Sequence, residues 1–381
     1  MVIRMRILVL ASLVVAAFTA PATAMAAFTP AERAAMRQAM EDEMQVAGYP
    51  GIVAGFWSPG RGSFVAATGL AVRRPERALR VGDTFRIGSV TKTFTATVVL
   101  QLVERGKLRL DDRLERYVKG IPAGRRIAIR QLLNHTSGIP DTSNSVQDAL
   151  YRDPTHRFHP MRVIRNAVRQ KRYCAPGACW HYSNTNYQLL GIIARQITGR
   201  SMHKLYEDGV TRRLHLERTS FEPGPTVPRP RAHGYTRETA GGPLIDTTGW
   251  DFYWSWTAGS MTSTLADLKR YAPALGTGHR LLRPRTQRTR LRFVPTGTQD
   301  IQYGLGIMQY AGLLGHDGAV PGYDSLVLYA PTTKAIIVLL GNTAVELDST
   351  KGKLTKDSAP PSTLFNLANC LALIAGGEAC D

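Results

Sequence analysis

Three short motifs in this chain hold residue types that can carry out acyl transfer. They occur in the order Ser89-Val-Thr-Lys92, Tyr182-Ser-Asn184 and His316-Asp-Gly318. The first supplies a nucleophile and a base, the second a phenol that can carry a proton, and the third a strand edge for substrate. Each motif alone has little specificity, but the ordered set predicts a serine ester intermediate.

Ser89 and Lys92 stand at the start of an uncharged stretch, Thr93 to Val103, which predicts a helix buried on nearly all sides. On a helix, side chains three positions apart share a face, with β-carbons roughly 5–6 Å apart. Burial disfavours the charged form of a lysine, so Lys92 can accept the serine proton. Amide groups at the helix N-terminus favour a developing negative charge. We therefore predict that Ser89 is the nucleophile and Lys92 its base.

A second Ser-x-x-Lys sequence, Ser201-Met-His-Lys204, shows that the pattern also arises by chance. It follows Thr198-Gly-Arg and precedes a charged amphipathic segment. Serine in that context commonly caps a helix, because its hydroxyl accepts a hydrogen bond from a backbone N–H of the first turn. We interpret Ser201 as an N-cap and Ser89 as the nucleophile.

Tyr182 and Asn184 precede an apolar helix pattern that runs from Leu189 to Ile197. A phenol near a lysine cation can pass a proton to a leaving group. The Asn184 amide can donate to a substrate amide or fix Lys92. A tyrosine at a helix entrance is also commonly a packing residue, and that alternative holds for Tyr182 taken alone.

His316-Asp-Gly318 precedes two apolar strand patterns, at residues 325–330 and 335–340. A glycine inside an edge strand permits close approach of a ligand to the backbone, in which case His316 faces the cleft. The alternative is a turn, because Asp317-Gly318 is a strong hairpin signal.

The ordered motifs resemble those of the penicillin-recognising serine hydrolases, in the branch that holds class C β-lactamases and serine D-alanyl-D-alanine carboxypeptidases. Further similar segments extend over nearly the whole chain after residue 26, at 85–89, 132–138, 175–178, 240–248 and 254–268. The resemblance implies an α/β (α+β) fold of the β-lactamase/transpeptidase-like type, with an antiparallel sheet flanked by helices plus an all-helical lobe. His316, in the place of the usual lysine, is more similar to carboxypeptidase and esterase relatives.

By this resemblance Ser89 is acylated, and Lys92 and Tyr182 transfer protons. The oxyanion hole consists of the backbone N–H groups of Ser89 and Ala319, of which one donor lowers the barrier by about 3–4 kcal/mol. Trp254 is implied to wall the substrate pocket. The residues implied to contact the substrate are Asn184, His316, Gly318, Ala319 and Trp254.

One departure from the family pattern concerns the substrate. Carboxypeptidases of this branch carry an arginine for the terminal carboxylate after the Tyr-Gly-Leu-Gly strand, whereas here Tyr303-Gly-Leu-Gly-Ile is followed by Met308. We expect a D-alanyl-D-alanine carboxypeptidase or penicillin-binding enzyme that acts on cell-wall peptides. An esterase or class C-like β-lactamase is the first alternative, favoured by the missing arginine. A non-catalytic peptidoglycan-binding protein is the second, and the combination of nucleophile, base and phenol argues against it.

Residues 1–26 predict a signal peptide. Two arginines precede an apolar run from Ile7 to Phe18, and two Ala-x-Ala sequences follow at 22–24 and 24–26. The run is short for a bilayer span and no other segment qualifies, so we expect no transmembrane span in the mature chain. An uncleaved membrane anchor is the alternative. We predict an exported protein, periplasmic or secreted.

The four cysteines form two local pairs, Cys174/Cys179 and Cys370/Cys380. Four cysteines permit three connectivities, and an oxidising compartment favours the local one. A disulfide across the first, small loop adds only roughly 2 kcal/mol, so its main effect would be to brace the approach to Tyr182. Four reduced, buried cysteines are the alternative. No His/Cys spacing supports a metal site, and we expect no cofactor.

The net charge is strongly positive, at +19. Without Arg4 and Arg6 the 48 basic residues fall to 46, against 29 acidic residues, which leaves +17. This charge could attract an anionic cell envelope, but we favour a general excess of arginine spread over the surface. Basic residues occur singly or in pairs and without a nucleic-acid motif, so we expect a small-molecule or peptide substrate and no nucleic-acid partner. We expect a monomer.

The elements that must position the motifs fall into two sets. Thr29 and Pro30 predict the start of an amphipathic helix that extends to Ala47. Strand patterns follow at 51–57 and 63–68, helical stretches occupy 127–134, 161–172, 186–198 and 201–214, strands return only after about 300, and a helix at 363–375 ends the chain. We therefore predict a sheet-containing α/β lobe from residues 27–105 and 216–381, an all-helical lobe from 106–215, and an active site between them.

Overall fold

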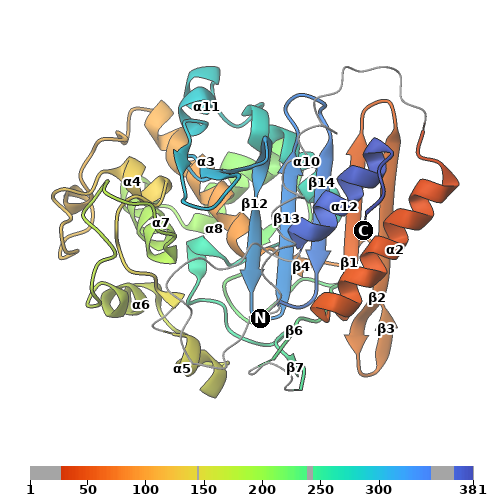
Figure 1. The fold of residues 1–381 in the computed structure, drawn as a ribbon. Helices are drawn as coiled ribbons and strands as arrows, with labels where there is room; N and C mark the ends of the chain where they lie inside the picture. Colours follow the sequence, from red (N-terminus) through yellow and green to blue (C-terminus); the bar gives the residue numbers. More distant parts are fainter. Residues whose placement is uncertain (1–26, 144–145, 238–242, 345–363, 381) are drawn as a thin grey trace, which may run out of the picture.

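The computed structural model describes residues 27–143, 146–237, 243–344 and 364–380. The predicted signal peptide, residues 1–26, and part of the 240–248 segment lie outside this range. A nine-stranded antiparallel sheet dominates the fold, in the order β3-β2-β1-β14-β13-β12-β11-β10-β9 (Figure 1). In that order the strands span Glu76–Ala78, Gly62–Arg73, Gly51–Ser58, Ile336–Gly341, Tyr323–Tyr329, Leu313–Val320, Met308–Tyr310, Ile301–Tyr303 and Val294–Pro295. Strands from both ends of the chain therefore form one sheet, as predicted.

The central strands are buried on both faces. In β14, Ile337 and Leu339 belong to one hydrophobic core, whereas Val338 and Leu340 belong to another. Successive side chains point to opposite faces of a sheet, so a continuous apolar run needs cover on both sides. The apolar pattern of this strand thus dictates helices above and below it.

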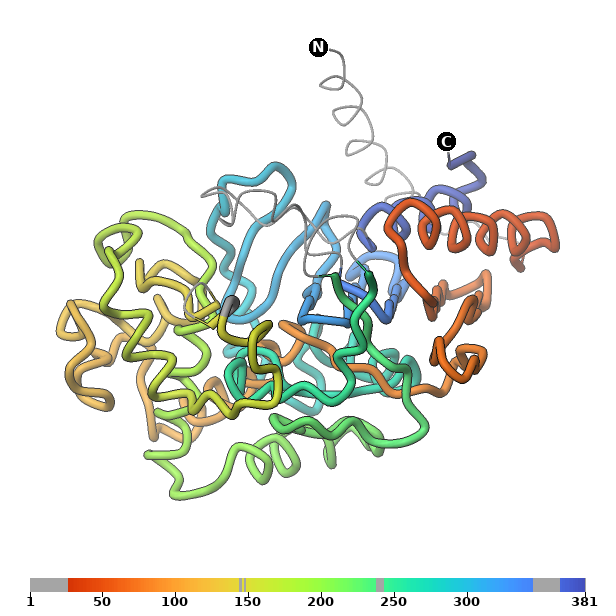
Figure 2. The backbone as a smooth tube through the Cα atoms, turned by 90° about the horizontal axis from the view of Figure 1, so that it is seen from below, coloured from red at the N-terminus to blue at the C-terminus, as the bar shows by residue number. Residues whose placement is uncertain are grey.

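Two terminal helices, α2 (Pro30–Ala47) and α12 (Leu364–Gly376), cover one face of the sheet and lie side by side in both ribbon and tube views (Figures 1 and 2). The start of α2 is the predicted one. The Thr29 hydroxyl accepts a hydrogen bond from the Glu32 N–H at 3.2 Å, and the Glu32 carboxylate accepts one from the Thr29 N–H at 2.7 Å. This reciprocal capping box satisfies two N–H groups that a helix end leaves free.

The opposite face carries α10 (Leu265–Thr277) and α3 (Thr91–Glu104), the helix that follows Ser89. The described part of residues 106–215 contains helices and no strand, and Figure 2 shows this segment gathered on one side of the sheet, in yellow to green. The division into two lobes stays a prediction. The remaining α-helices are α4 (Ile129–Leu133), α5 (Gln147–Arg152), α6 (Pro160–Ala167), α7 (Asn184–Thr198), α8 (Met202–Tyr206), α9 (Arg212–Leu214) and α11 (Pro284–Arg290).

The prediction that strands return only after about residue 300 is wrong. Short strands form a three-stranded sheet in the order β4-β8-β5 and a hairpin of β6 and β7, in addition to β9 of the main sheet. Strand β4 spans Phe85–Arg86, β8 spans Met261–Ser263, β5 spans Ser220–Phe221, β6 spans Tyr235–Thr236 and β7 spans Ile245–Asp246. Two or three residues are too few to display an alternating pattern. The helix predicted at 201–214 is also interrupted, by a π-helical turn at Glu207–Thr211.

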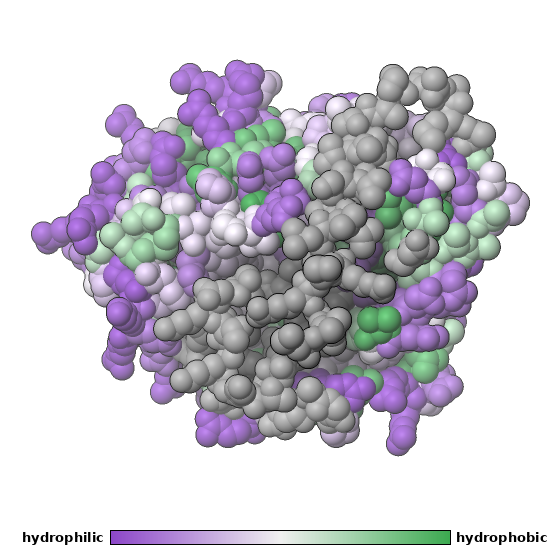
Figure 3. Space-filling model, in the orientation of Figure 1, coloured by the Kyte–Doolittle hydropathy of each residue, from purple (hydrophilic) through white to green (hydrophobic). Residues whose placement is uncertain are grey.

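In the view of Figure 3, hydrophilic side chains are prominent at the left and right margins of the molecule, with smaller apolar areas among them on each side. Among the residues that the structure describes, no helix combines the length and the apolar character needed to cross a bilayer.

Candidate active site

The Ser89 side chain stands at the junction of a short 3-10 turn, η1 (Gly88–Val90), and helix α3. Every residue of α3 from Thr91 to Leu102 is buried, which confirms the predicted buried helix. Its threonines satisfy their hydroxyls inside the core; that of Thr95, for example, donates to the carbonyl of Thr257 at 2.7 Å. Ser89 itself is only partly buried and lines a pocket of about 90 Å³.

The Lys92 side chain is fully buried and its nitrogen contacts three oxygen atoms. Nζ lies 2.9 Å from Ser89 Oγ, 2.6 Å from Asn184 Oδ1 and 2.8 Å from the carbonyl oxygen of Ala258. Burial lowers the pKa of Lys92 to about 7, against the opposing effect of the Asp141 and Asp317 charges. A substantial fraction of the amine is therefore neutral at neutral pH.

A neutral amine offers two N–H donors and one lone pair. The oxygens of Asn184 and Ala258 can only accept, so they take the two N–H groups. The Ser89 hydroxyl is the remaining partner and can donate, which directs its proton along the lone pair of Lys92. This hydrogen-bond arrangement is the one that a base for Ser89 requires, and the role of Lys92 as that base stays a prediction.

Asn184, the first residue of α7, holds the amine from the other side. Its Nδ2 group donates to Ser143 Oγ at 2.9 Å and lies 3.3 Å from Asp141 Oδ2, which fixes its oxygen toward Lys92. Asp141 also accepts from the backbone N–H of Asn184 at 2.7 Å. Of the two sequence-based roles for Asn184, the geometry supports the fixing of Lys92.

Tyr182 lies two residues before α7, with its ring 4.8 Å from the Lys92 nitrogen. Burial, with a contribution from the Asp317 charge, raises the pKa of the Tyr182 phenol well above its usual value, while a hydrogen bond with Ser89 opposes the shift. The phenol therefore keeps its proton at neutral pH. The structure brings Ser89, Lys92 and Tyr182 together, as the motifs predicted, and leaves their catalytic roles as predictions.

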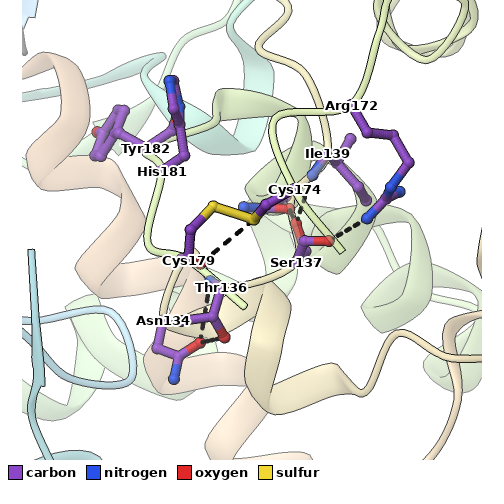
Figure 4. Close-up of a disulfide and its surroundings, with 10 residues drawn as sticks. Asn134, Thr136, Ser137, Ile139, Arg172, Cys174, Cys179, His181 and Tyr182 are labelled. Atoms are coloured by element: carbon purple, nitrogen blue, oxygen red, sulfur yellow. Dashed lines mark hydrogen bonds between the residues drawn. A yellow bond between two sulfur atoms is a disulfide. The ribbon is translucent and has the colours of Figure 1, made fainter. Parts of the chain in front are cut away.

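The loop that leads to Tyr182 is braced on two sides. A disulfide joins Cys174 and Cys179, and His181 and Tyr182 follow two and three residues after Cys179 (Figure 4). The ring of His181 stacks on Tyr173 with centroids 3.3 Å apart. A second disulfide, Cys370–Cys380, ties the middle of α12 to the C-terminal residues.

Two glycines allow strand β12 to pass directly beside η1. A β-carbon on Gly318 would lie 2.8 Å from the Ser89 nitrogen and 2.2 Å from the Ile87 carbonyl oxygen. One on Gly88, whose φ is +43°, would lie 2.8 Å from the Ala319 nitrogen. This close approach brings Ser89 and Ala319, which both line the pocket, next to each other, and an oxyanion hole formed by their backbone N–H groups stays a prediction.

His316 lies in the middle of β12 and not in a turn, but its side chain is only 1% exposed. Its Nε2 lies 2.8 Å from the Tyr303 hydroxyl, and its Nδ1 lies 2.6 Å from the Asp317 carbonyl oxygen. Both ring nitrogens are thus engaged behind the strand. Direct contact between His316 and a substrate stays a prediction.

The pocket beside Ser89 is lined by polar and apolar side chains, and among the described residues no lysine, arginine or histidine lines it. Trp254 and Ala319 form part of its wall, and their contact with a substrate stays a prediction. Met308, where an arginine was expected, is 5% exposed and packs into the core beneath α2 and α12. That position supplies no charge to the pocket.

A family comparison covers most of the chain, because the family described as Beta-lactamase matches residues 36–358. The chain belongs to this family. The match agrees with the resemblance to penicillin-recognising serine hydrolases and with the predicted β-lactamase/transpeptidase-like fold.

Curated relatives of this beta-lactamase family member include putative penicillin-binding protein PbpX of Bacillus subtilis (strain 168), 25% identical over 68% of this chain and 62% of that protein. Penicillin-binding protein 4* of the same strain is 25% identical over 71% and 63%, respectively. Protein flp of Staphylococcus aureus (strain N315) is 30% identical over 47% of this chain and 36% of that protein. The matches span less than two thirds of each relative's length.

Similar solved structures cover more of this family member. A D-stereospecific amidohydrolase from Streptomyces sp. has a TM-score of 0.74 and 30% identity, over 82% of this chain and 94% of that one. A D-amino acid amidase from Ochrobactrum anthropi SV3, complexed with L-phenylalanine amide, has a TM-score of 0.74 and 26% identity, over 83% and 93%. An octameric penicillin-binding protein homologue from Pyrococcus abyssi, at 24% identity and a TM-score of 0.73 over 90% and 77%, shares the fold.

Three contributors to this family member's site had no assigned role in the sequence analysis. Asp141 orients Asn184, the Ala258 carbonyl accepts from Lys92, and the His135 ring stacks on Tyr182 with centroids 4.4 Å apart. Burial lowers the pKa of His135 well below its usual value, and the Lys92 charge adds to this shift. The sequence signals were the location of His135 and Asp141 in and shortly after the family-like segment 132–138, and of Ala258 in the family-like segment 254–268.

Among the described residues, no group of three or more histidine, cysteine, aspartate or glutamate side chains is placed to hold a metal ion.

Proposed function

We propose that this protein is a serine hydrolase that forms an acyl-enzyme on Ser89. The observation that carries the proposal is the contact of Lys92 Nζ with Ser89 Oγ at 2.9 Å, in a site where the other two partners of the amine can only accept hydrogen bonds. A buried, half-neutralised lysine next to a pocket-lining hydroxyl meets the requirement for an activated nucleophile.

The reaction that this geometry supports has two stages. Ser89 Oγ attacks the substrate carbonyl carbon while its proton passes to Lys92 Nζ, and the backbone amides of Ser89 and Ala319 bind the oxyanion. The bond from carbonyl carbon to leaving nitrogen then breaks, and the Tyr182 phenol relays the proton from Lys92 to that nitrogen. In the second stage water attacks the ester, the acid departs and Ser89 regains a proton.

Amides of D-amino acids are the substrate class that we infer. Two supporting observations are the D-amino acid amidase and D-stereospecific amidohydrolase among the similar structures and the absence of cations from the described pocket lining. An amide releases ammonia or an amine and needs no partner for a terminal carboxylate, whereas a carboxypeptidase substrate carries one. Esters and β-lactams would use the same acyl-enzyme.

D-Alanyl-D-alanine carboxypeptidase activity, the first expectation from the sequence, is the second candidate. The two Bacillus penicillin-binding relatives favour it. Met308 weighs against it, since this position leaves the terminal carboxylate without a cation. A binding protein without catalysis is the least supported alternative, because binding alone requires neither the nucleophile nor its base.

The test combines intact mass with product analysis. We expect D-phenylalanine amide to be hydrolysed faster than an acyl-D-alanyl-D-alanine peptide, and a fluorescent penicillin to add one acyl group to the wild-type protein. Ser89→Ala should abolish both reactions. Labelling that persists in Ser89→Ala would exclude Ser89 as the nucleophile, and a faster reaction with the peptide would favour the carboxypeptidase.

We also propose that the chain is exported and acts as a monomer on a small-molecule or peptide substrate. The two disulfides support an oxidising compartment. Mass measurement of the mature protein would test removal of residues 1–26 and both disulfides, and light scattering would test the monomer.

A further inference from the structure

Asp317 places a carboxylate on the open face of strand β12. In this strand only Asp317 and Ala319 are not buried. Side chains two positions apart on a strand share a face, and Ala319 lines the pocket together with Ser89. The Asp317 side chain is 34% exposed. The strand edge beside the nucleophile therefore carries a solvent-accessible negative charge.

The His316 ring lies close to this carboxylate. Its Nδ1 lies 3.2 Å from Asp317 Oδ1, while Nε2 of the same ring lies against the Tyr303 hydroxyl. An N–H on Nδ1 has the Asp317 backbone carbonyl oxygen at 2.6 Å as its nearest acceptor and the carboxylate as a more distant one, and Nε2 can then accept from the phenol. Within the described part of the chain, no lysine or arginine forms an ion pair with Asp317. Its charge is therefore not neutralised by a described lysine or arginine.

The field of this carboxylate reaches the proton-transfer groups. After burial, Asp317 is the main influence that raises the pKa of the Tyr182 phenol, and with Asp141 it opposes the burial that lowers the pKa of Lys92. A charge that acts on both groups also acts on a substrate bound between them and β12. Because the described pocket lining supplies no cation, a second negative charge there would be repelled.

We propose that Asp317 determines the charge of the substrate portion that lies along β12: it rejects donors with a carboxylate there and favours neutral or protonated groups. This inference rests on the proposed acyl-enzyme chemistry of Ser89 and adds the charge rule to it. The preference for amides over free peptide acids would then have two causes: the negative charge of Asp317 and the absence of an arginine at position 308. Specificity of this kind comes from repulsion of the wrong substrate.

The experiment uses two donors that share the acyl group and the scissile bond, D-phenylalanyl-glycine and D-phenylalanyl-glycinamide. They differ only in the charge of the leaving portion. We expect the wild-type protein to prefer the glycinamide in kcat/KM, and Asp317→Asn to reduce this preference about tenfold. Any effect of the substitution on Lys92 applies to both donors and cancels in the ratio. Higher salt should weaken the preference of the wild type more than that of the variant.

Asp111→Asn is the matched control, because Asp111 is an exposed carboxylate that pairs with Arg130 at 2.7 Å in the segment before α4. It should leave the preference unchanged. A wild-type preference that survives in Asp317→Asn, or a wild type without preference, overturns the inference while acylation of Ser89 stands. If neither donor reacts and no penicillin or ester labels Ser89, the proposed function fails, and the charge rule fails with it.

Discussion

The two Ser-x-x-Lys sequences of this chain both lie at helix starts, yet their serines are used differently. Ser201 caps α8, and its hydroxyl accepts a hydrogen bond from the backbone N–H of Lys204 at 3.3 Å. Neither η1 nor α3 has a side-chain cap, so the Ser89 hydroxyl is not committed to the backbone. A serine can act as a nucleophile only where its hydroxyl is left for a base.

The two lysines differ in the same way. The Lys204 side chain is 44% exposed, and its nitrogen lies 2.8 Å from Glu207 and 3.5 Å from Asp208. An ammonium group between two carboxylates has no lone pair to offer. Lys92 is fully buried among uncharged oxygen atoms, where burial favours the neutral amine. The comparison shows that desolvation and partner type, and not the spacing, lower the pKa of one lysine, as the proposed role of Lys92 as a base requires.

Replacement of each lysine by methionine is the largest test of this contrast. We expect Lys92→Met to slow acylation of Ser89 by about 10²–10⁴-fold, because it removes the general base. Lys204→Met should leave the rate at the wild-type value. Rates come from the growth of the acyl adduct in intact mass, and circular dichroism checks that both variants are folded. Acylation at near-normal rate in Lys92→Met would refute its role as base.

The pH dependence should single out Lys92 as well. Acylation requires the neutral amine, so kcat/KM should rise through a pKa of about 7 and fall about tenfold per pH unit below it. Stability follows the same group. Above pH 7 and up to about 10.4 the unfolded chain binds a proton on Lys92 that the folded chain lacks, so the free energy of unfolding should rise with pH. Between pH 7 and pH 9, denaturant titrations should show a smaller rise in the free energy of unfolding for Lys92→Met than for the wild type. An equal rise in the two proteins would contradict the lowered pKa of Lys92.

Much of the fold could be predicted because its signals are local. Thr29 and Pro30 mark a helix start through their own hydrogen-bonding and φ preferences. The uncharged run of α3 and the apolar run of β14 predict burial by composition alone. The same locality explains why the three motifs could be recognised before their spatial arrangement was known.

The rest of the site depends on contacts between distant parts of the chain. Ala258 contributes a backbone carbonyl, which any residue type could supply, and Asp141 acts through Asn184 across 43 positions. The orientation of the His316 ring is set by a hydrogen bond between its Nε2 and the Tyr303 hydroxyl. Motif spacing does not encode these directions, so sequence could identify His316 but not its orientation.

A smaller effect is expected from the disulfide in the loop before Tyr182. No disulfide braces the segment around Ser201 and Lys204 in the described part of the chain. We expect Cys174→Ser/Cys179→Ser to lower kcat a few-fold, because Tyr182 follows the disulfide by three residues, and to cost about 2 kcal/mol of stability. Cys370→Ser/Cys380→Ser is the matched control, which should lose stability but keep its kcat. Equal kcat in the two double variants would remove the link between this disulfide and Tyr182.

The smallest expected effect concerns Ser201 itself. Ser201→Ala should reduce the free energy of unfolding by about 1 kcal/mol, because the first turn of α8 loses its cap. Ser201→Asp keeps an acceptor at the cap position and should retain most of the stability. Both variants should acylate Ser89 at the wild-type rate, as measured by penicillin labelling beside denaturant unfolding. Loss of labelling in a folded Ser201→Ala protein would instead identify Ser201 as the nucleophile and contradict the assignment to Ser89.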